Sequence, residues 1–129
     1  MDTCFNAMLL DAEGGLRATP RGAEIDVRLP WYRSLPISVV VVGSLKVDGQ
    51  EVPPSGIRFE VNGKSFGLDQ LPAQAGEFWF VLDSSVLRLP DVRVQPGTNH
   101  DVELQLNLYP PYVPHLKWVT KVRKTLRAR

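Results

Sequence analysis

The chain has one cysteine, Cys4, and two histidines, His100 and His115, among its 129 residues. A single cysteine excludes a disulfide within the chain, and we expect Cys4 to be a small apolar strand residue. The two histidines do not have the spacing of a metal-binding pair, and neither a glycine-rich phosphate loop nor a serine in an elbow-type turn is apparent. The sequence therefore carries no self-sufficient catalytic set. We expect no catalytic residue, no metal site and no bound cofactor in this chain.

Long apolar runs are also absent. The run of four valines at residues 39–42 is far shorter than the about 20 apolar residues that a helix needs to cross a bilayer. The chain opens without a basic region followed by an apolar one, as a secretory signal would require. From these two features we expect a soluble, cytoplasmic protein with no membrane partner.

The formal net charge of +1 hides an asymmetry along the chain. Residues 117–129 contain six basic side chains and no acidic one, whereas the first 116 residues carry nine basic and fourteen acidic side chains, a net charge of −5. A basic end on an acidic body can bind nucleic acid or an acidic protein, or it can be a solvated tail. We expect no nucleic-acid partner, because the aromatic residues are not interleaved with the basic ones and acidic side chains line the outward strand positions.

The residues that are present indicate β-structure. Apolar side chains alternate with polar ones over residues 24–29 and 100–108, as in half-buried strands. Asn62-Gly63 and Asp48-Gly49 are typical of tight hairpin turns, and Pro96-Gly97 marks a third turn. Turn signals at short intervals predict an all-β fold: a single antiparallel β-sandwich, jelly-roll-like or a flattened barrel, with little or no helix. We expect residues 1–129 to form one domain with a basic C-terminal segment from about residue 117.

Further elements follow from the same patterns. We expect an opening strand near residues 5–10, a polar loop over residues 11–23, strands over residues 77–82 and 86–89, and a C-terminal strand that frays into a basic tail. Trp118, Val122 and Leu126 would also line one face of a helix, but the valines and threonines favour a strand. The predicted core is Ile25, Val27, Leu29, Phe59, Val61, Phe78, Phe80, Val102, Leu104 and Leu106.

Two aromatic loops are the candidate binding residues. Trp31, Tyr32 and Arg33 lie between Pro30 and Pro36, directly after the first alternating strand. The second loop, residues 109–115, combines three prolines with two tyrosines and a histidine and follows the strand that ends at residue 108. Loops of this composition are more often binding surfaces than core, and both can lie at one end of a sandwich.

From these loops we select Trp31, Tyr32, Arg33, Tyr112 and His115 as residues that contact a partner or a substrate. The alternative is that the aromatic side chains only cap the core and that the prolines prevent edge pairing. His100, which opens a strand, is interpreted as a turn residue.

Three segments resemble the small β subunit of the bacterial C-glycoside deglycosidases. They are DVRLPWYRSLP at residues 26–36, LKVDGQEVP at 45–53 and IRF at 57–59. The similarity extends from about Ala23 to Pro114, and the DVRLPWYR block is its most specific part. The resemblance implies a larger α subunit, a metal-dependent (β/α) barrel with a divalent metal (Mn or Mg), that assembles with this chain into a higher hetero-oligomer.

The resemblance also implies the reaction. These enzymes act on C-glycosides already oxidised at the sugar 3-position, and they cleave the carbon–carbon bond to the aromatic aglycone. A 3-ketone acidifies the C2–H, a divalent metal stabilises the enediolate, and an acid protonates the leaving aryl carbon. The main acid/base and the metal ligands would belong to the larger subunit, with the 3-oxo C-glycoside at the subunit interface. The alternative is a stand-alone carbohydrate-binding or adaptor β-sandwich that uses its aromatic loops.

Overall fold

The computed structural model describes residue 10 and residues 13–20 and 22–129. These residues form eleven strands and three short 3-10 helices, named here in chain order. They are β1 (Glu13–Thr19), β2 (Gly22–Arg28), β3 (Leu35–Pro36), η1 (Ile37–Val39), β4 (Val40–Val47), β5 (Gln50–Glu51), η2 (Pro54–Gly56), β6 (Arg58–Val61), β7 (Lys64–Gly67), η3 (Leu68–Ala73), β8 (Phe78–Trp79), β9 (Ser84–Leu89), β10 (Asn99–Leu108) and β11 (Trp118–Ala128). The expected all-β fold is confirmed.

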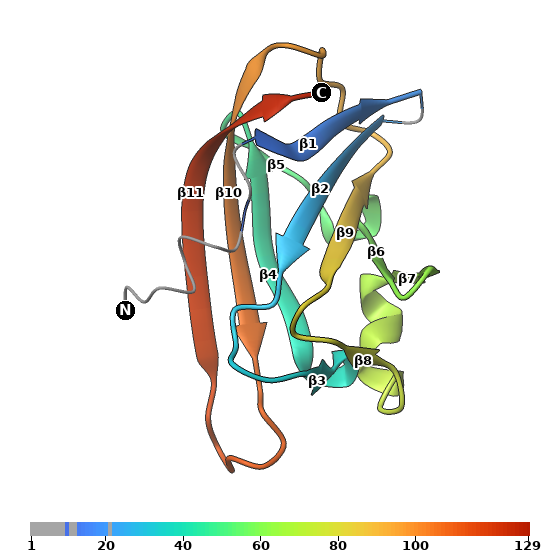
Figure 1. The fold of residues 1–129 in the computed structure, drawn as a ribbon, viewed down its shortest axis with the longest axis vertical. Helices are drawn as coiled ribbons and strands as arrows, with labels where there is room; N and C mark the ends of the chain where they lie inside the picture. Colours follow the sequence, from blue (N-terminus) through green and yellow to red (C-terminus); the bar gives the residue numbers. More distant parts are fainter. Residues whose placement is uncertain (1–9, 11–12, 21) are drawn as a thin grey trace.

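Nine strands hydrogen-bond into one sheet in the order β5-β4-β10-β11-β1-β2-β9-β6-β7, and β3 pairs with β8 separately. Neighbouring strands are antiparallel except β1 and β11, which run parallel. The sheet curls, so that β4, β10 and β11 lie opposite β2, β9 and β6 (Figure 1). Helix η3 contacts β4 near one edge of the sheet and β7 at the other. The shape is therefore that of a flattened barrel whose opening is covered by η3.

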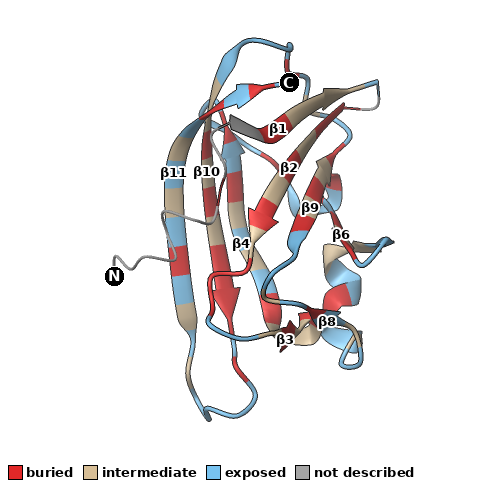
Figure 2. Cartoon of the chain, in the orientation of Figure 1, coloured by how far each residue is buried: buried red, intermediate tan, exposed pale blue. Residues whose placement is uncertain are grey.

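The core fills the inside of this curl (Figure 2). Val102 and Leu104 of β10 lie opposite Val47 and Leu45 of β4, and all four side chains are buried. On the facing strands Ile25 is fully buried, and it is paired with Leu87 of β9. Eight of the ten predicted core residues are buried: Ile25, Val27, Leu29, Phe59, Val61, Val102, Leu104 and Leu106.

Phe78 and Phe80 were predicted to be buried, and the structure shows the opposite. Their side chains are 40% and 50% exposed, whereas Trp79 between them is fully buried against Phe59 at a ring-centroid distance of 5.5 Å. The alternation was identified correctly, but its phase was wrong. The expected strand over residues 77–82 is also shorter, because only Phe78 and Trp79 pair with β3.

Two other predictions were wrong at the ends of the chain. The polar loop expected over residues 11–23 contains β1 and the beginning of β2. The C-terminal segment is a strand, as expected, but it does not fray: β11 pairs with β10 as far as Arg127, and Arg129 exchanges two backbone hydrogen bonds with β1. Cys4 and most of the expected strand at residues 5–10 lie outside the described residues. Leu10 is buried and forms an isolated bridge with Val27.

The predicted tight turns are confirmed. Asn62 and Gly63 both have positive φ angles, of 54° and 76°, as a type I′ turn requires. Asp48 and Gly49 have φ angles of 52° and 81° between β4 and β5. No helix in the described part of the chain is long and apolar enough to cross a membrane.

The side-chain carboxylate of Asp48 connects the turn at Asp48-Gly49 to the beginning of β10. His100 Nδ1 lies 2.7 Å from Asp48 Oδ2, and the backbone N–H of Asp101 donates to Asp48 Oδ1. The hydrogen bond with His100 is the main cause that lowers the pKa of Asp48. Above its ordinary pKa of about 4, the ionised Asp48 carboxylate contributes its full stabilisation of the fold. This contribution is lost as the pH falls through the lower pKa of Asp48 in the folded state.

We expect Asp48→Asn to lower the free energy of unfolding at neutral pH by at most about 1 kcal/mol, the value of an exposed pair. Asparagine tolerates the positive φ angle, so the substitution does not strain the turn. The difference from the wild-type chain should shrink towards acidic pH, and urea titrations between pH 3 and pH 7 measure it. His100→Ala, which removes the same contact from the other side, should reproduce the loss. A constant difference across this pH range would contradict the assignment.

Candidate functional site

The first aromatic loop leaves β2 at Pro30, which has no N–H to continue the ladder. The Trp31 side chain packs against this end of the barrel and is only 8% exposed. Its ring packs edge-on against Trp118 of β11 at 5.4 Å and lies 5.1 Å from the ring of Tyr32. Tyr32, by contrast, is 62% exposed. The buried tryptophan thus anchors the loop, and the next two residues project from it.

The second loop joins β10 to β11 and supplies Tyr112. Trp31 Nε1 donates a hydrogen bond of 2.5 Å to Tyr112 Oη, which in turn donates to Tyr32 Oη at 3.2 Å. The Arg33 guanidinium lies over the Tyr112 ring, 4.7 Å from its centroid, in a cation–π arrangement. The structure therefore brings four of the five predicted site residues together at one end of the barrel, where the β10–β11 loop projects (Figure 1). We call these four residues the aromatic cluster.

The hydrogen bonds lead from the buried Trp31 through Tyr112 to the exposed hydroxyl of Tyr32. The hydrogen bond with Tyr112 is the first cause that raises the pKa of Tyr32 above its ordinary value, and the nearby Arg33 opposes this shift. Tyr32 therefore keeps its proton at neutral pH. Because its oxygen already accepts a bond from Tyr112, its O–H is free to donate to an acceptor outside the chain. The cluster thus presents a hydroxyl donor beside a guanidinium.

His115 lies in the same loop but outside the aromatic cluster. Within the described residues we find no hydrogen bond or ring contact that joins it to the cluster. It lines a small groove of about 330 Å³ with Tyr109, Lys117 and the three prolines of the loop. Its φ angle of 63° lies in the left-handed region, which histidine adopts more often than most residues other than glycine. The predicted contact of His115 with a partner or a substrate stays a prediction.

Two further residues contribute contacts at this end of the barrel and were not predicted from the sequence. Trp118, the first residue of β11, supports Trp31, and its only signal was its position three residues after the second aromatic loop. Ser34 is the other: its Oγ accepts a hydrogen bond of 2.9 Å from the backbone N–H of Val81, which attaches the first aromatic loop to the segment after β8. Neither contact has a local sequence pattern.

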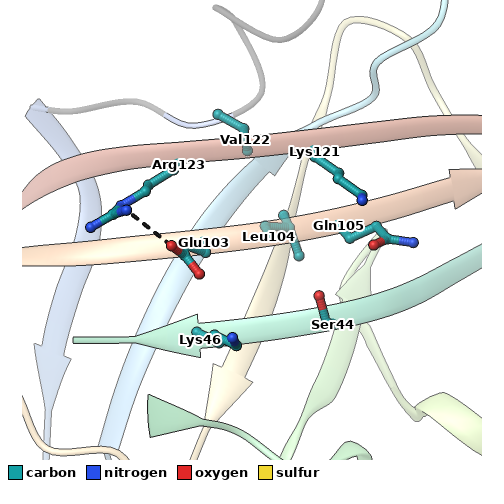
Figure 3. A pocket seen from close by; sticks show the side chains of 8 residues that line it. All are labelled: Ser44, Lys46, Glu103, Leu104, Gln105, Lys121, Val122 and Arg123. Atoms are coloured by element: carbon teal, nitrogen blue, oxygen red, sulfur yellow. Dashed lines mark ion pairs between the residues drawn. The ribbon is translucent and has the colours of Figure 1, made fainter. Parts of the chain in front are cut away.

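Another depression lies on the outer face of β4, β10 and β11 (Figure 3). Its volume is about 380 Å³, and Lys46, Lys121 and Arg123 provide its positive charges. Arg123 is neutralised by Asp101 at 2.8 Å and Glu103 at 3.3 Å. None of its lining residues is aromatic, so it offers no platform for a base or a sugar ring. The aromatic cluster is the better candidate site.

Residues 10, 13–20 and 22–129 contain no group of three or more His, Cys, Asp or Glu side chains that could hold a metal ion. The divalent metal that the resemblance implies has no matching donor set in this part of the chain.

Fold and site together define a small β-barrel that presents rigid aromatic rings, a hydroxyl donor and a cation at one end. This combination is typical of proteins that bind a partner or a ligand.

Residues 13–112 match the family of C-glycoside deglycosidase beta subunits, and the chain belongs to this family. The C-glycoside deglycosidase beta subunit of Microbacterium trichothecenolyticum is 40% identical over 101 residues, which cover 78% of this chain and 76% of the relative. The 3'-dehydrocarminate deglycosidase beta subunit of a Microbacterium species is 35% identical over 102 residues, 79% of this chain and 76% of the relative. A C-glycoside deglycosidase beta subunit of Arthrobacter globiformis is 39% identical over 92 residues, 70% of each chain. The matched family region includes Trp31, Tyr32, Arg33 and Tyr112 and ends before His115.

Proposed function

We propose that this chain is the small β subunit of a heteromeric lyase that releases the aromatic aglycone from 3-oxo C-glycosides. The observation that carries the proposal is the family match, because it spans most of the barrel and all four residues of the aromatic cluster. The larger subunit is a (β/α) barrel that holds the divalent metal, Mn or Mg, together with the main acid/base. The assembly is a higher hetero-oligomer that acts in the cytoplasm.

The aromatic cluster gives this chain a defined part in that assembly. We place it against the larger subunit at the mouth of the active site, with the aglycone beside it. Trp31 is buried and cannot stack on a ligand, whereas the exposed ring of Tyr32 can. The Tyr32 O–H and the Arg33 guanidinium are positioned to stabilise negative charge on a phenolic oxygen of the departing aglycone. His115 extends this surface from the second loop.

Assembly with the larger subunit is the direct test of the proposal. The two chains are co-expressed, with a purification tag on the larger subunit only, and the eluate is separated by size-exclusion chromatography. We expect this chain to elute with the larger subunit in a fixed ratio. Elution of a folded chain by itself, combined with binding of a free sugar, would support the stand-alone carbohydrate-binding protein instead.

A further inference from the structure

Three large apolar side chains are exposed on the segment that follows η3. Phe78 on β8 is 40% exposed, Phe80 is 50% exposed, and Leu82 is 81% exposed in the turn that the Asp83 N–H closes on the Phe80 carbonyl oxygen. We call these three residues the apolar stripe. Single exposed apolar residues are ordinary on protein surfaces, whereas a group of them in one short segment is typical of an interface.

The backbone beneath the apolar stripe is firmly held. The carbonyl oxygen of Phe78 accepts a hydrogen bond from the Asn62 side chain at 2.8 Å, and Trp79 Nε1 donates to the carbonyl oxygen of Asp83 at 3.0 Å. The Trp79 side chain between Phe78 and Phe80 is fully buried. The backbone N–H of Asp83 donates to the Phe80 carbonyl oxygen at 2.9 Å, which closes the turn that carries Leu82. Because its main chain is already ordered, this segment would lose little conformational entropy when a partner covers it.

The segment that carries the apolar stripe is bonded to the first aromatic loop. Strand β8 pairs with β3, which follows the first aromatic loop, and Val81 between Phe80 and Leu82 is bonded to Ser34 of that loop. Both features lie towards the end of the barrel where the β10–β11 loop projects (Figure 1). One partner surface can therefore cover both. The charged neighbour Glu77 is already paired with Lys64 at 2.7 Å, so it does not oppose an apolar contact.

We infer that the apolar stripe is the anchor by which this chain binds the larger subunit of its enzyme. The inference rests on the proposed function, since a chain of this family has a subunit partner to bind. The partner surface that fits is an apolar pocket, with a hydrogen-bond acceptor or acidic group at its rim facing Arg33. The apolar stripe supplies affinity, and the aromatic cluster acts on turnover.

The test separates affinity from turnover. Phe80→Ser and Leu82→Ser are prepared singly and together, and Val119→Ser is the control. Val119 is also an exposed apolar residue, at 37%, but it lies on β11 away from the apolar stripe. Leu82 is largely exposed, so its substitution leaves the fold intact, which circular dichroism verifies.

We expect the double variant to raise the Kd for the larger subunit by at least roughly thirtyfold, as loss of a hot spot does. Each single variant should have a smaller effect, and the control should stay within about twofold. At saturating larger subunit, kcat should be unchanged in all variants. If the wild-type chain binds the larger subunit and the variants bind equally well, the anchor is refuted while the proposed function stands. If the wild-type chain does not bind, both are refuted, and loss of a homodimer in the variants would assign the apolar stripe to a second copy of this chain.

Discussion

Replacing Trp31 by alanine is expected to lower the free energy of unfolding by about 3–5 kcal/mol, the usual cost of truncating a buried tryptophan. The side chain packs against Trp118, supports Tyr32 and donates to Tyr112, so its loss removes the base of the aromatic cluster. A drop of this size is a large part of the stability of a small domain. Guanidinium titration followed by circular dichroism measures it, and an unchanged midpoint would contradict the anchoring role.

The same substitution should also reduce the activity of the assembled enzyme. Without its anchor the loop no longer fixes Tyr32 and Arg33, and a misplacement of about 1 Å can lower turnover by roughly a hundredfold. The assay uses saturating larger subunit at a temperature where the variant remains folded. If the variant has the same turnover as the wild-type enzyme, this result contradicts the proposed place of the first aromatic loop at the active site.

Two milder variants separate packing from hydrogen bonding. Tyr112→Phe removes only the hydroxyl that accepts from Trp31, so it should cost about 1 kcal/mol. Trp31→Phe loses the N–H and part of the buried ring, so its cost should lie between that of Tyr112→Phe and that of Trp31→Ala. Tyr109→Phe is the matched control, because Tyr109 is an exposed tyrosine of the same loop that lies outside the hydrogen-bond chain. We expect it to match the wild-type chain in both assays.

Local chemistry predicted much of this fold. The strands over residues 24–29 and 100–108 have one clearly polar and one clearly apolar face, so their phase follows from the sequence alone. The hairpin turns could be predicted because Asn-Gly and Asp-Gly tolerate positive φ angles. In each case the information lies within a few adjacent residues.

The errors occurred where contacts between distant residues decide the structure. Residues 78–82 have apolar side chains on both faces, so alternation cannot say which face is buried. The pairing of Trp79 with Leu35 of β3 settles the phase. Strand β1 pairs in parallel with β11, more than a hundred residues along the chain, and no pattern within residues 13–19 indicates this.

The candidate site shows the same division. Loop composition identified Trp31, Tyr32, Arg33 and Tyr112, because aromatic and arginine side chains between prolines are typical of binding surfaces. Composition could not tell that Trp31 is buried while Tyr32 is exposed, since both are large and adjacent. It also could not predict the hydrogen bond to Tyr112, which comes from a loop eighty-one positions away.

Carbon–carbon bond cleavage should depend on both subunits. Under the proposed function the metal and the main acid/base belong to the larger subunit, so we expect this chain to release no aglycone by itself. The larger subunit alone should also be slow, because the surface that we propose to face the aglycone would be missing. Together the two should act at rates typical of enzymes, on the order of 1–1000 per second.

The most direct measurement is therefore the release of aglycone from a 3-oxo C-glycoside as this chain is titrated into a fixed amount of the larger subunit with its metal. The account predicts negligible release by either subunit alone and a rate that rises with added chain until it saturates at the ratio of the complex. A rate that does not change with the added chain, or robust release by this chain without any partner, would contradict it.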